Sequence, residues 1–570
     1  MVKRPFCLIQ AVFLILVVAF SSFAQTKPAA DLLITNAKVW TVDQAHPTAQ
    51  AIAVLGERIV AVGPNDEVSL WRGPGTRVID AGGKRVLPGF NDAHVHFVSG
   101  GQQLDAVELN DATSAEEFAR RIADRAKKTS SGEWIMGGDW DETKWNPAVF
   151  PTKELIDAAT GNTPVFVNRY DGHMALANSA ALKLAGVTAN TQDPPGGKIV
   201  RDARGNPTGA LKDAAMDYVY KVVPPLTHDQ RMHAVRRALA HAASLGVTSV
   251  QDMNPDYADI AIFSELLDRG DLTARIYAAP LITQVDDQTR IGIRRAFGSS
   301  LLRIGALKAY ADGSLGSGTA YFFEPFTDQP GNRGLLSDEM HPVSLMRDRM
   351  MKADAAGLQL CTHAIGDEGI STILDLYAEV IKEHGESDRR FRIEHAQHMA
   401  AKDFDRFANL KVIASVQPYH AIDDGRWAEK RIGHDRASRT YAFRTFMDHG
   451  VRLAFGTDWN VAPLNPMLTL YAAVSRRTLD GKNPGGWFPE QRLSLAEAIE
   501  AYTLGSAYAE FQEKEKGSIT PGKLADLVML SYDPLADGPP VDVDKLRDVK
   551  VLLTVVGGKI VWDAASGANQ

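Results

Sequence analysis

The chain has 570 residues, of which 45% are hydrophobic and 23% are charged, and its formal net charge is −8. This length exceeds one ordinary domain core, and the balance of residue types predicts a folded, globular chain with added modules. An acidic balance is the opposite of the basic excess typical of nucleic-acid-binding proteins, so we expect no nucleic-acid partner.

The first residues have the pattern of a secretory signal. Lys3 and Arg4 precede an apolar run from Leu8 to Phe20, and Ser22-Phe23-Ala24 places small residues at the two positions that a signal peptidase reads. We expect residues 1–24 to be removed, and the mature chain to be periplasmic or secreted without stable membrane insertion. The alternative is an uncleaved anchor, which the short apolar run disfavours.

The two ends of the mature chain read alike. Residues 25–85 contain short apolar runs separated by tight turns, as at Gly56-Glu57, and residues 511–570 repeat this texture around Gly557-Gly558. We predict that both ends form one small β-sandwich domain, which the chain leaves to build its central part and to which it then returns.

Residues 86–510 alternate strand-like runs with helical stretches, a pattern typical of parallel strands with crossover helices. Eight strands predict an α/β fold with a (β/α)₈ barrel of TIM type. The predicted strands are 87–90, 247–250, 274–281, 302–309, 358–363, 391–393, 412–416 and 452–455. Residues from about 104 to 241 fall outside this series and contain strands of their own at 133–137 and 164–168. We interpret them as an insertion after the first barrel strand that lies over the active site.

Residues suited to metal binding stand where barrel strands end. His94 and His96 alternate on the first strand and therefore share a face. Asp458, Lys308 and two further histidines, His363 and His395, follow the same rule on four other strands. Each has an ordinary explanation, such as a core histidine, a helix cap or a snorkelling lysine. Because the C-terminal mouth of a TIM barrel carries the active site, together they indicate one metal centre.

These residues resemble the amidohydrolase superfamily, in particular its N-substituted formamide deformylase-like branch (amidohydrolase family 3). The resemblance extends over nearly the whole chain. It includes the runs 88–96, 308–317, 363–367, 392–397, 456–458 and 517–528.

The resemblance implies two divalent metal ions. His94 and His96 would hold the first ion with Asp458, and His363 and His395 would hold the second. A lysine ammonium has no acceptor, so Lys308 would ligate as a carbamate formed with CO₂ and bridge the ions. Zinc fits these nitrogen and oxygen ligands best, although Mn, Co or Fe could occupy them.

The implied function is that of an enzyme that hydrolyses carbon–nitrogen bonds other than peptide bonds in a small-molecule substrate. The bond would belong to an N-substituted formamide, an N-acyl amine or a cyclic imide, attacked by a metal-activated hydroxide, with Asp458 as the catalytic proton carrier. Three alternatives stay open: a mononuclear deaminase-like enzyme, an ester or lactone hydrolase on the same barrel, and a non-catalytic exported binding protein. A homo-oligomer also stays open.

Four residues are predicted to bind substrate. Trp140, Arg169 and His173 lie in runs of the insertion that resemble the deformylase-like branch, and Gln417 follows the seventh barrel strand. Ordinary packing of the insertion is the alternative, and for Trp140 it is the favoured one.

Overall fold

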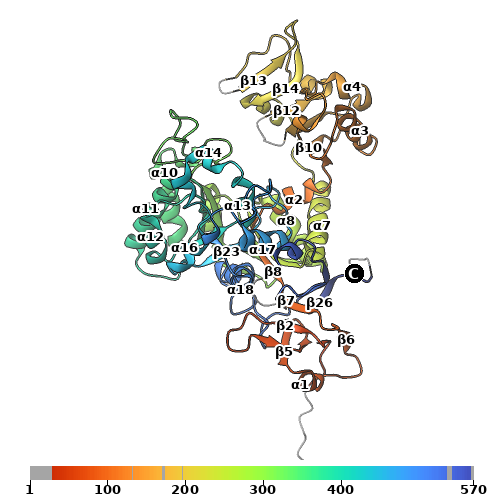
Figure 1. Cartoon of the computed structure of the whole chain (residues 1–570), viewed down its shortest axis with the longest axis vertical. Helices are drawn as coiled ribbons and strands as arrows, with labels where there is room; N and C mark the ends of the chain where they lie inside the picture. The colour runs from red at the N-terminus through yellow and green to blue at the C-terminus, as the bar shows by residue number, and fades with distance from the viewer. Residues whose placement is uncertain (1–27, 131, 170–173, 195–196, 536–541, 567–570) are drawn as a thin grey trace, which may run out of the picture.

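The computed structural model describes residues 28–130, 132–169, 174–194, 197–535 and 542–566. Its central body is an α/β arrangement of TIM-barrel type, with a small β-rich region at one end and the insertion at the other (Figure 1). The predicted signal, residues 1–24, lies outside the described residues. Within them, no helix combines the length and apolar character that a bilayer span requires.

Two five-stranded sheets surround the central core. One has the order β17-β18-β16-β15-β8 and the other β19-β20-β21-β22-β23. Isolated parallel bridges, Leu281 with Lys308 and Val95 with Trp459, link the sheets at their two seams. The strands of these two sheets are β8 (Phe90–Val95), β15 (Val247–Met253), β16 (Arg275–Ala279), β17 (Phe297–Gly298), β18 (Leu302–Ile304), β19 (Ala306–Tyr310), β20 (Gln359–Ala364), β21 (Arg392–His395), β22 (Ile413–Val416) and β23 (Leu453–Phe455).

Amphipathic helices cover the strands and complete the main hydrophobic core. Two of them begin at reciprocal capping boxes, at Thr227 and at Asp256. The larger helices are α2 (Phe97–Gln103), α7 (His228–Ser244), α8 (Tyr257–Arg269), α10 (Val343–Ala355), α11 (Asp367–His384), α12 (Asp403–Asn409), α13 (Pro418–Asp424), α16 (Phe443–Asp448) and α17 (Pro466–Ser475).

Two predicted strands were wrong in their bounds. The run 87–90 straddles two strands: β7 (Arg85–Pro88) belongs to the terminal sheet, and the barrel strand is β8. The run 302–309 is divided at Gly305, whose φ of +132° suits glycine. A Cβ there would lie 2.2 Å from the carbonyl oxygen of Arg294, so only glycine permits the break between β18 and β19.

The chain ends form two sheets, and only the second of these combines strands from both ends. One sheet has the order β5-β4-β1-β6, and the other has the order β26-β25-β24-β7-β2-β3. The C-terminal strand β24 (Leu527–Leu530) pairs antiparallel with the N-terminal strand β7, as the matching textures of the ends predicted. One apolar cluster contains residues of both sheets. The remaining strands are β1 (Leu32–Thr35), β2 (Lys38–Trp40), β3 (Thr48–Ala49), β4 (Ala51–Leu55), β5 (Arg58–Gly63), β6 (Arg77–Asp80), β25 (Val551–Val556) and β26 (Lys559–Asp563).

The insertion forms its own six-stranded sheet with its own apolar clusters. It stands apart from the barrel, joined to it beside α2 and α7 (Figure 1). The predicted end at about 241 is too late, because Met232, Val235 and Leu239 on α7 pack in the main barrel core. The elements of the insertion are β9 (Val107–Glu108), α3 (Ala115–Ala126), β10 (Ile135–Trp140), α4 (Glu154–Thr160), β11 (Val165–Arg169), β12 (Met174–Ala177), α5 (Ser179–Leu184), β13 (Gly197–Arg201) and β14 (Pro207–Asp213).

A buried ion pair ties the barrel to the terminal sheets, and its removal is expected to destabilise the protein. Arg275 on β16 donates two hydrogen bonds to Asp526, at 2.7 and 2.8 Å, and both side chains are about 95% buried. Asp526→Ala leaves a buried guanidinium unpaired, so we expect a loss of about 3–5 kcal/mol, seen as a lower midpoint of thermal unfolding. Asp348→Ala, which breaks an exposed pair with Arg347, is the control and should change little. Equal midpoints for both variants would contradict the assignment.

Candidate metal centre

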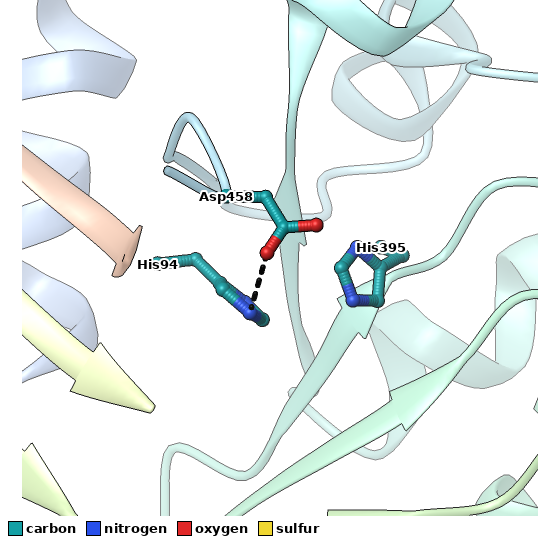
Figure 2. A group of neighbouring side chains, drawn as sticks. All are labelled: His94, His395 and Asp458. Carbon is teal, nitrogen blue, oxygen red and sulfur yellow. Dashed lines mark ion pairs between the residues drawn. The ribbon is translucent and has the colours of Figure 1, made fainter. Parts of the chain in front are cut away.

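Three side chains from three barrel strands converge at the mouth of the barrel. His94, His395 and Asp458 offer ligand atoms that all lie within 4.8 Å of one another (Figure 2). The nearer oxygen of Asp458, Oδ1, lies 3.5 Å from Nε2 of His94 and 3.2 Å from Nε2 of His96. The alternation predicted for the first strand therefore brings both of its histidines to the same carboxylate.

Hydrogen bonds at Nδ1 orient three of the histidines. Nδ1 of His94 lies 2.6 Å from Oε2 of Glu394, and Nδ1 of His395 lies 2.8 Å from Oε1 of Gln417. Nδ1 of His96 lies 2.8 Å from Oδ1 of Asn254. Because each partner atom is an oxygen acceptor, Nδ1 carries the proton and Nε2 keeps the lone pair that a metal requires.

His363 is held through its other nitrogen. Its Nε2 lies 3.1 Å from the carbonyl oxygen of Gly313, which leaves Nδ1 as the free acceptor. Its ring centroid lies 4.5 Å from that of His395. Asp312 fixes the surrounding loops by accepting backbone hydrogen bonds from Tyr321, Ile365 and Gly366. His363 is thus adjacent to the three converging ligands and has a nitrogen available.

Lys308 lies buried beside this group of side chains. Its side chain is fully buried, and its Nζ lies 3.4 Å from Nε2 of His94. Burial lowers the pKa of Lys308, while the carboxylates of Glu394 and Asp458 oppose that shift. A lysine with a depressed pKa has a larger share of the neutral amine, which is the form that reacts with CO₂.

Most of the pKa shifts in the cluster fit a cation; His96 differs, because burial lowers its pKa but the hydrogen bond and charge of Asp458 raise it overall. Burial, followed by the charge of Lys308, lowers the pKa of His94 to about 4 and that of His363 to about 3. Burial opposes ionisation of Asp458, but the surrounding histidines hold its pKa well below the usual value. Neutral imidazoles around a carboxylate are the donor set that divalent transition metals prefer.

Two of the three converging residues have a strained backbone. His395 and Asp458 adopt positive φ values, 74° and 61°, which are costly for residues other than glycine. Asp92 braces the loop of Asp458, accepting hydrogen bonds from the backbone and hydroxyl of Thr457 and from the hydroxyl of Tyr502. The strain is maintained by buried hydrogen bonds, as expected where a site must hold one geometry.

A buried charge network supports His94. Glu394 bonds Nδ1 of His94 through Oε2, and its Oε1 lies 2.8 Å from Nε of Arg392. Arg392 also donates to the backbone oxygen of Ala93 and to the hydroxyl of Ser415. All these side chains are fully buried. Alternation on β21 places Arg392 and Glu394 on the same inward face. This spacing is visible in the sequence, but no role was predicted from it for either residue.

Glu394→Gln is expected to weaken metal retention by about 10–100-fold, because the amide loses the charge that orients and polarises His94. Competition with a chelator, followed by elemental mass spectrometry, measures this without any substrate. Glu386→Gln is the control, since that side chain is largely exposed. Unchanged metal affinity in Glu394→Gln would show that the network serves folding alone.

The four predicted substrate-binding residues do not lie together in the structure. Gln417 is fully buried and accepts a hydrogen bond from His395, so it orients that imidazole ring. Trp140 lies in the core of the insertion, where its indole donates to the carbonyl oxygen of Val167. Arg169 pairs with Glu142 in the same insertion. The structure does not bring these two to the metal cluster, and His173 lies outside the described residues.

One residue near the cluster was missed in the sequence. His420 on α13 stacks on His395, with ring centroids 6.4 Å apart, and its Nε2 lies 3.9 Å from Oδ2 of Asp458. It follows Gln417 by three residues, so the same helical turn positions both side chains. That spacing after the seventh barrel strand was the available signal.

Comparison with known proteins shows the family. The model of an amidohydrolase family (Amidohydro_3) matches residues 77–562. The chain belongs to this family. It is 38% identical over 556 residues to the protein LONG AFTER FAR-RED 3 of Arabidopsis thaliana, covering 94% of this chain and 93% of the relative. It is 28% identical to the N-substituted formamide deformylase of Arthrobacter pascens, covering 94% and 98%.

A solved structure agrees with the family assignment. A metal-dependent hydrolase of Pyrococcus furiosus superposes with a TM-score of 0.74 at 29% identity, covering 88% of this chain and 99% of that one. Together with the ligand cluster, these likenesses make the chain a metal-dependent hydrolase that acts on carbon–nitrogen bonds.

Proposed function

We propose that this hydrolase cleaves a non-peptide, amide-like C–N bond, with N-substituted formamides as the first substrate class and N-acyl amines and cyclic imides as the next. The site would hold two divalent ions, zinc by preference, on His94, His96 and Asp458 and on His363 and His395. A carbamate on Lys308 would bridge them. The formamide class is supported by the relative from Arthrobacter pascens, which is similar over nearly the whole chain.

The position of Lys308 carries the proposal. Its buried Nζ faces His94 and lies among groups that suit a cation, where a permanent ammonium would compete with any metal. Conversion of that amine to a carbamate replaces a positive charge by an anionic oxygen donor. A mononuclear deaminase-like site has no need of this group, so Lys308 favours the binuclear alternative.

The chain's own residues then have two roles, which are proton transfer and the orientation of the histidines. Bound divalent ions would lower the pKa of a water molecule and polarise the acyl carbonyl. Asp458 takes a proton from the attacking water and delivers it to the departing nitrogen, which leaves poorly unless protonated. The depressed pKa of Asp458 keeps it ionised and able to accept that proton at neutral pH. Glu394, Asn254 and Gln417 keep His94, His96 and His395 in their ligand tautomers.

The decisive experiment combines metal content with a substrate panel. The chain from residue 25, prepared with zinc and bicarbonate, is expected to retain about two ions per chain and to release amine and formate from N-butylformamide. The panel also contains an N-acetyl amine, a cyclic imide, an ester and a lactone. Ester or lactone turnover without amide turnover would overturn the substrate class. One ion per chain, with deamination as the activity, would favour the mononuclear alternative.

Location and domain organisation remain part of the same proposal. We propose that residues 1–24 direct export to the periplasm or the medium, and that the two terminal sheets form one small β-sandwich domain. The residues of the barrel, from 86 to 510, would then hold the whole centre. A fractionation experiment on the native host, with the N-terminus of the mature protein sequenced, tests the first point directly.

A further inference from the structure

His420 has a buried polar atom for which the described residues supply no hydrogen-bond partner. Its Nε2 is inaccessible to solvent, and the side chain as a whole is only 12% exposed. An unpaired buried imidazole nitrogen is costly, so we expect this nitrogen to find a partner beyond the described residues, such as a bound ligand. The position of this nitrogen, at the metal cluster, limits what that partner can be.

The arrangement around Asp458 separates its two oxygens. Oδ1 faces the Nε2 atoms of His94 and His96, whereas Oδ2 faces Nε2 of His420 at 3.9 Å. That distance is too long for a hydrogen bond. His420 therefore lies on the side of the carboxylate away from His94 and His96.

Electrostatics decides which form of the ring faces Asp458. A lone pair on Nε2 would be repelled by the carboxylate, whereas an N–H is attracted to it. The carboxylate thus favours an N–H at Nε2, so His420 can present a donor at this position. The acceptor that a C–N hydrolase brings to this position is the acyl oxygen of its substrate.

We propose that His420 is a substrate-contact residue that donates a hydrogen bond from Nε2 to the acyl oxygen of the substrate, and this rests on the proposed amide hydrolysis. The bond strengthens as the carbonyl oxygen gains negative charge during attack, because a preformed donor stabilises a developing oxyanion. The product carboxylate offers the same acceptor. The site thus recognises carbonyl and carboxylate oxygens by the same atom.

The contact is built into the fold through one helical turn. The backbone N–H of His420 donates to the carbonyl oxygen of Gln417 at 3.1 Å, and the Gln417 side chain holds His395. The rings of His395 and His420 lie nearly parallel, with 15° between their planes. The turn that begins α13 therefore fixes a metal ligand and the proposed donor in one piece, which keeps their spacing constant.

Three variants test the proposal in the metal-loaded protein. His420→Ala is expected to keep the wild-type metal content while kcat/KM for N-butylformamide falls by about 10²-fold or more, the cost of one lost oxyanion donor. His420→Gln, whose amide can donate, should recover part of this loss. His449→Ala removes a histidine that pairs with Asp405 on the outside of the barrel, and it should match the wild type. Isothermal titration with formate gives a readout without turnover, and His420→Ala should weaken its binding about tenfold.

Each contrary outcome has a separate meaning. Loss of metal from His420→Ala would make the residue a ligand and overturn the proposal, as would an activity within threefold of the wild type. If the wild type hydrolyses no member of the panel, the proposed function fails. Formate binding then becomes the test of whether His420 contacts a carboxylate oxygen. Equal formate affinity in the wild type and His420→Ala would overturn the inference in that case, and weaker binding by the variant would support it.

Discussion

Asp458→Asn is expected to lower kcat/KM by about 10²–10⁴-fold while the protein stays folded. Asparagine has nearly the same size, but its amide cannot take up a proton at neutral pH, so general base and acid functions are lost together. The native carboxylate is ionised, with its pKa held well below the usual value by the histidines around it. Steady-state kinetics on N-butylformamide, together with circular dichroism, measures both parts of the expectation.

Metal content separates the two roles of Asp458. Full metal occupancy with lost turnover would assign the loss to proton transfer, whereas the absence of one ion would assign it to the ligand role of Oδ1. Asp435→Asn is the matched control, because that carboxylate is 89% exposed and pairs with Arg439. Full activity in Asp458→Asn would refute the proposed mechanism.

Lys308→Ala is expected to remove the bridge between the two ions. Metal content should fall below the wild-type value. The kcat should drop by more than about 10²-fold, because loss of a group that merely supports a metal ligand already costs up to about that factor. The physical reason is the loss of the anionic oxygens that the carbamate would supply to both ions. Elemental mass spectrometry and turnover assays on the same preparations measure the two effects.

Chemical rescue makes the Lys308 prediction specific. The alanine variant leaves space beside His94 that a short carboxylic acid can enter, and such an acid supplies the oxygens of the missing carbamate. Adding acetate or propionate should therefore restore part of the metal content and activity of Lys308→Ala. Lys352→Ala, on the exterior of α10, should respond to neither acid. Wild-type metal content in Lys308→Ala would rule out the bridge.

Many residues of the site could be predicted because the barrel topology brings the ends of all its strands to one place. The ends of parallel strands meet at one mouth, so His94 converges with His395 and Asp458 although about 300 or more positions separate it from them. The alternation of side chains along a strand placed His94 and His96 on one carboxylate. These consequences need only strand position and parity, which local patterns of apolar residues indicate.

Other features depended on contacts between distant segments. The division of the run 302–309 at Gly305 follows from the approach of the carbonyl of Arg294, and the extra length given to the insertion ignored the packing of α7 on the barrel. Arg169 and Trp140 were candidate substrate contacts, with packing the favoured role for Trp140, and the partners of both lie within the insertion. No local pattern reports which neighbour a tryptophan or an arginine will find.

By itself, the sequence determined the fold class, the family and the residue types at the mouth of the barrel, because strand periodicity and ligand chemistry are local properties. Only the tertiary structure decided how each ligand is used. It showed which nitrogen of each histidine is held, placed the Arg392–Glu394 pair behind His94, turned Gln417 from a substrate contact into an orienting group, and brought His420 close to Oδ2 of Asp458. Hydrogen bonds between buried groups from different strands made those choices, and their geometry exists only once the strands have assembled.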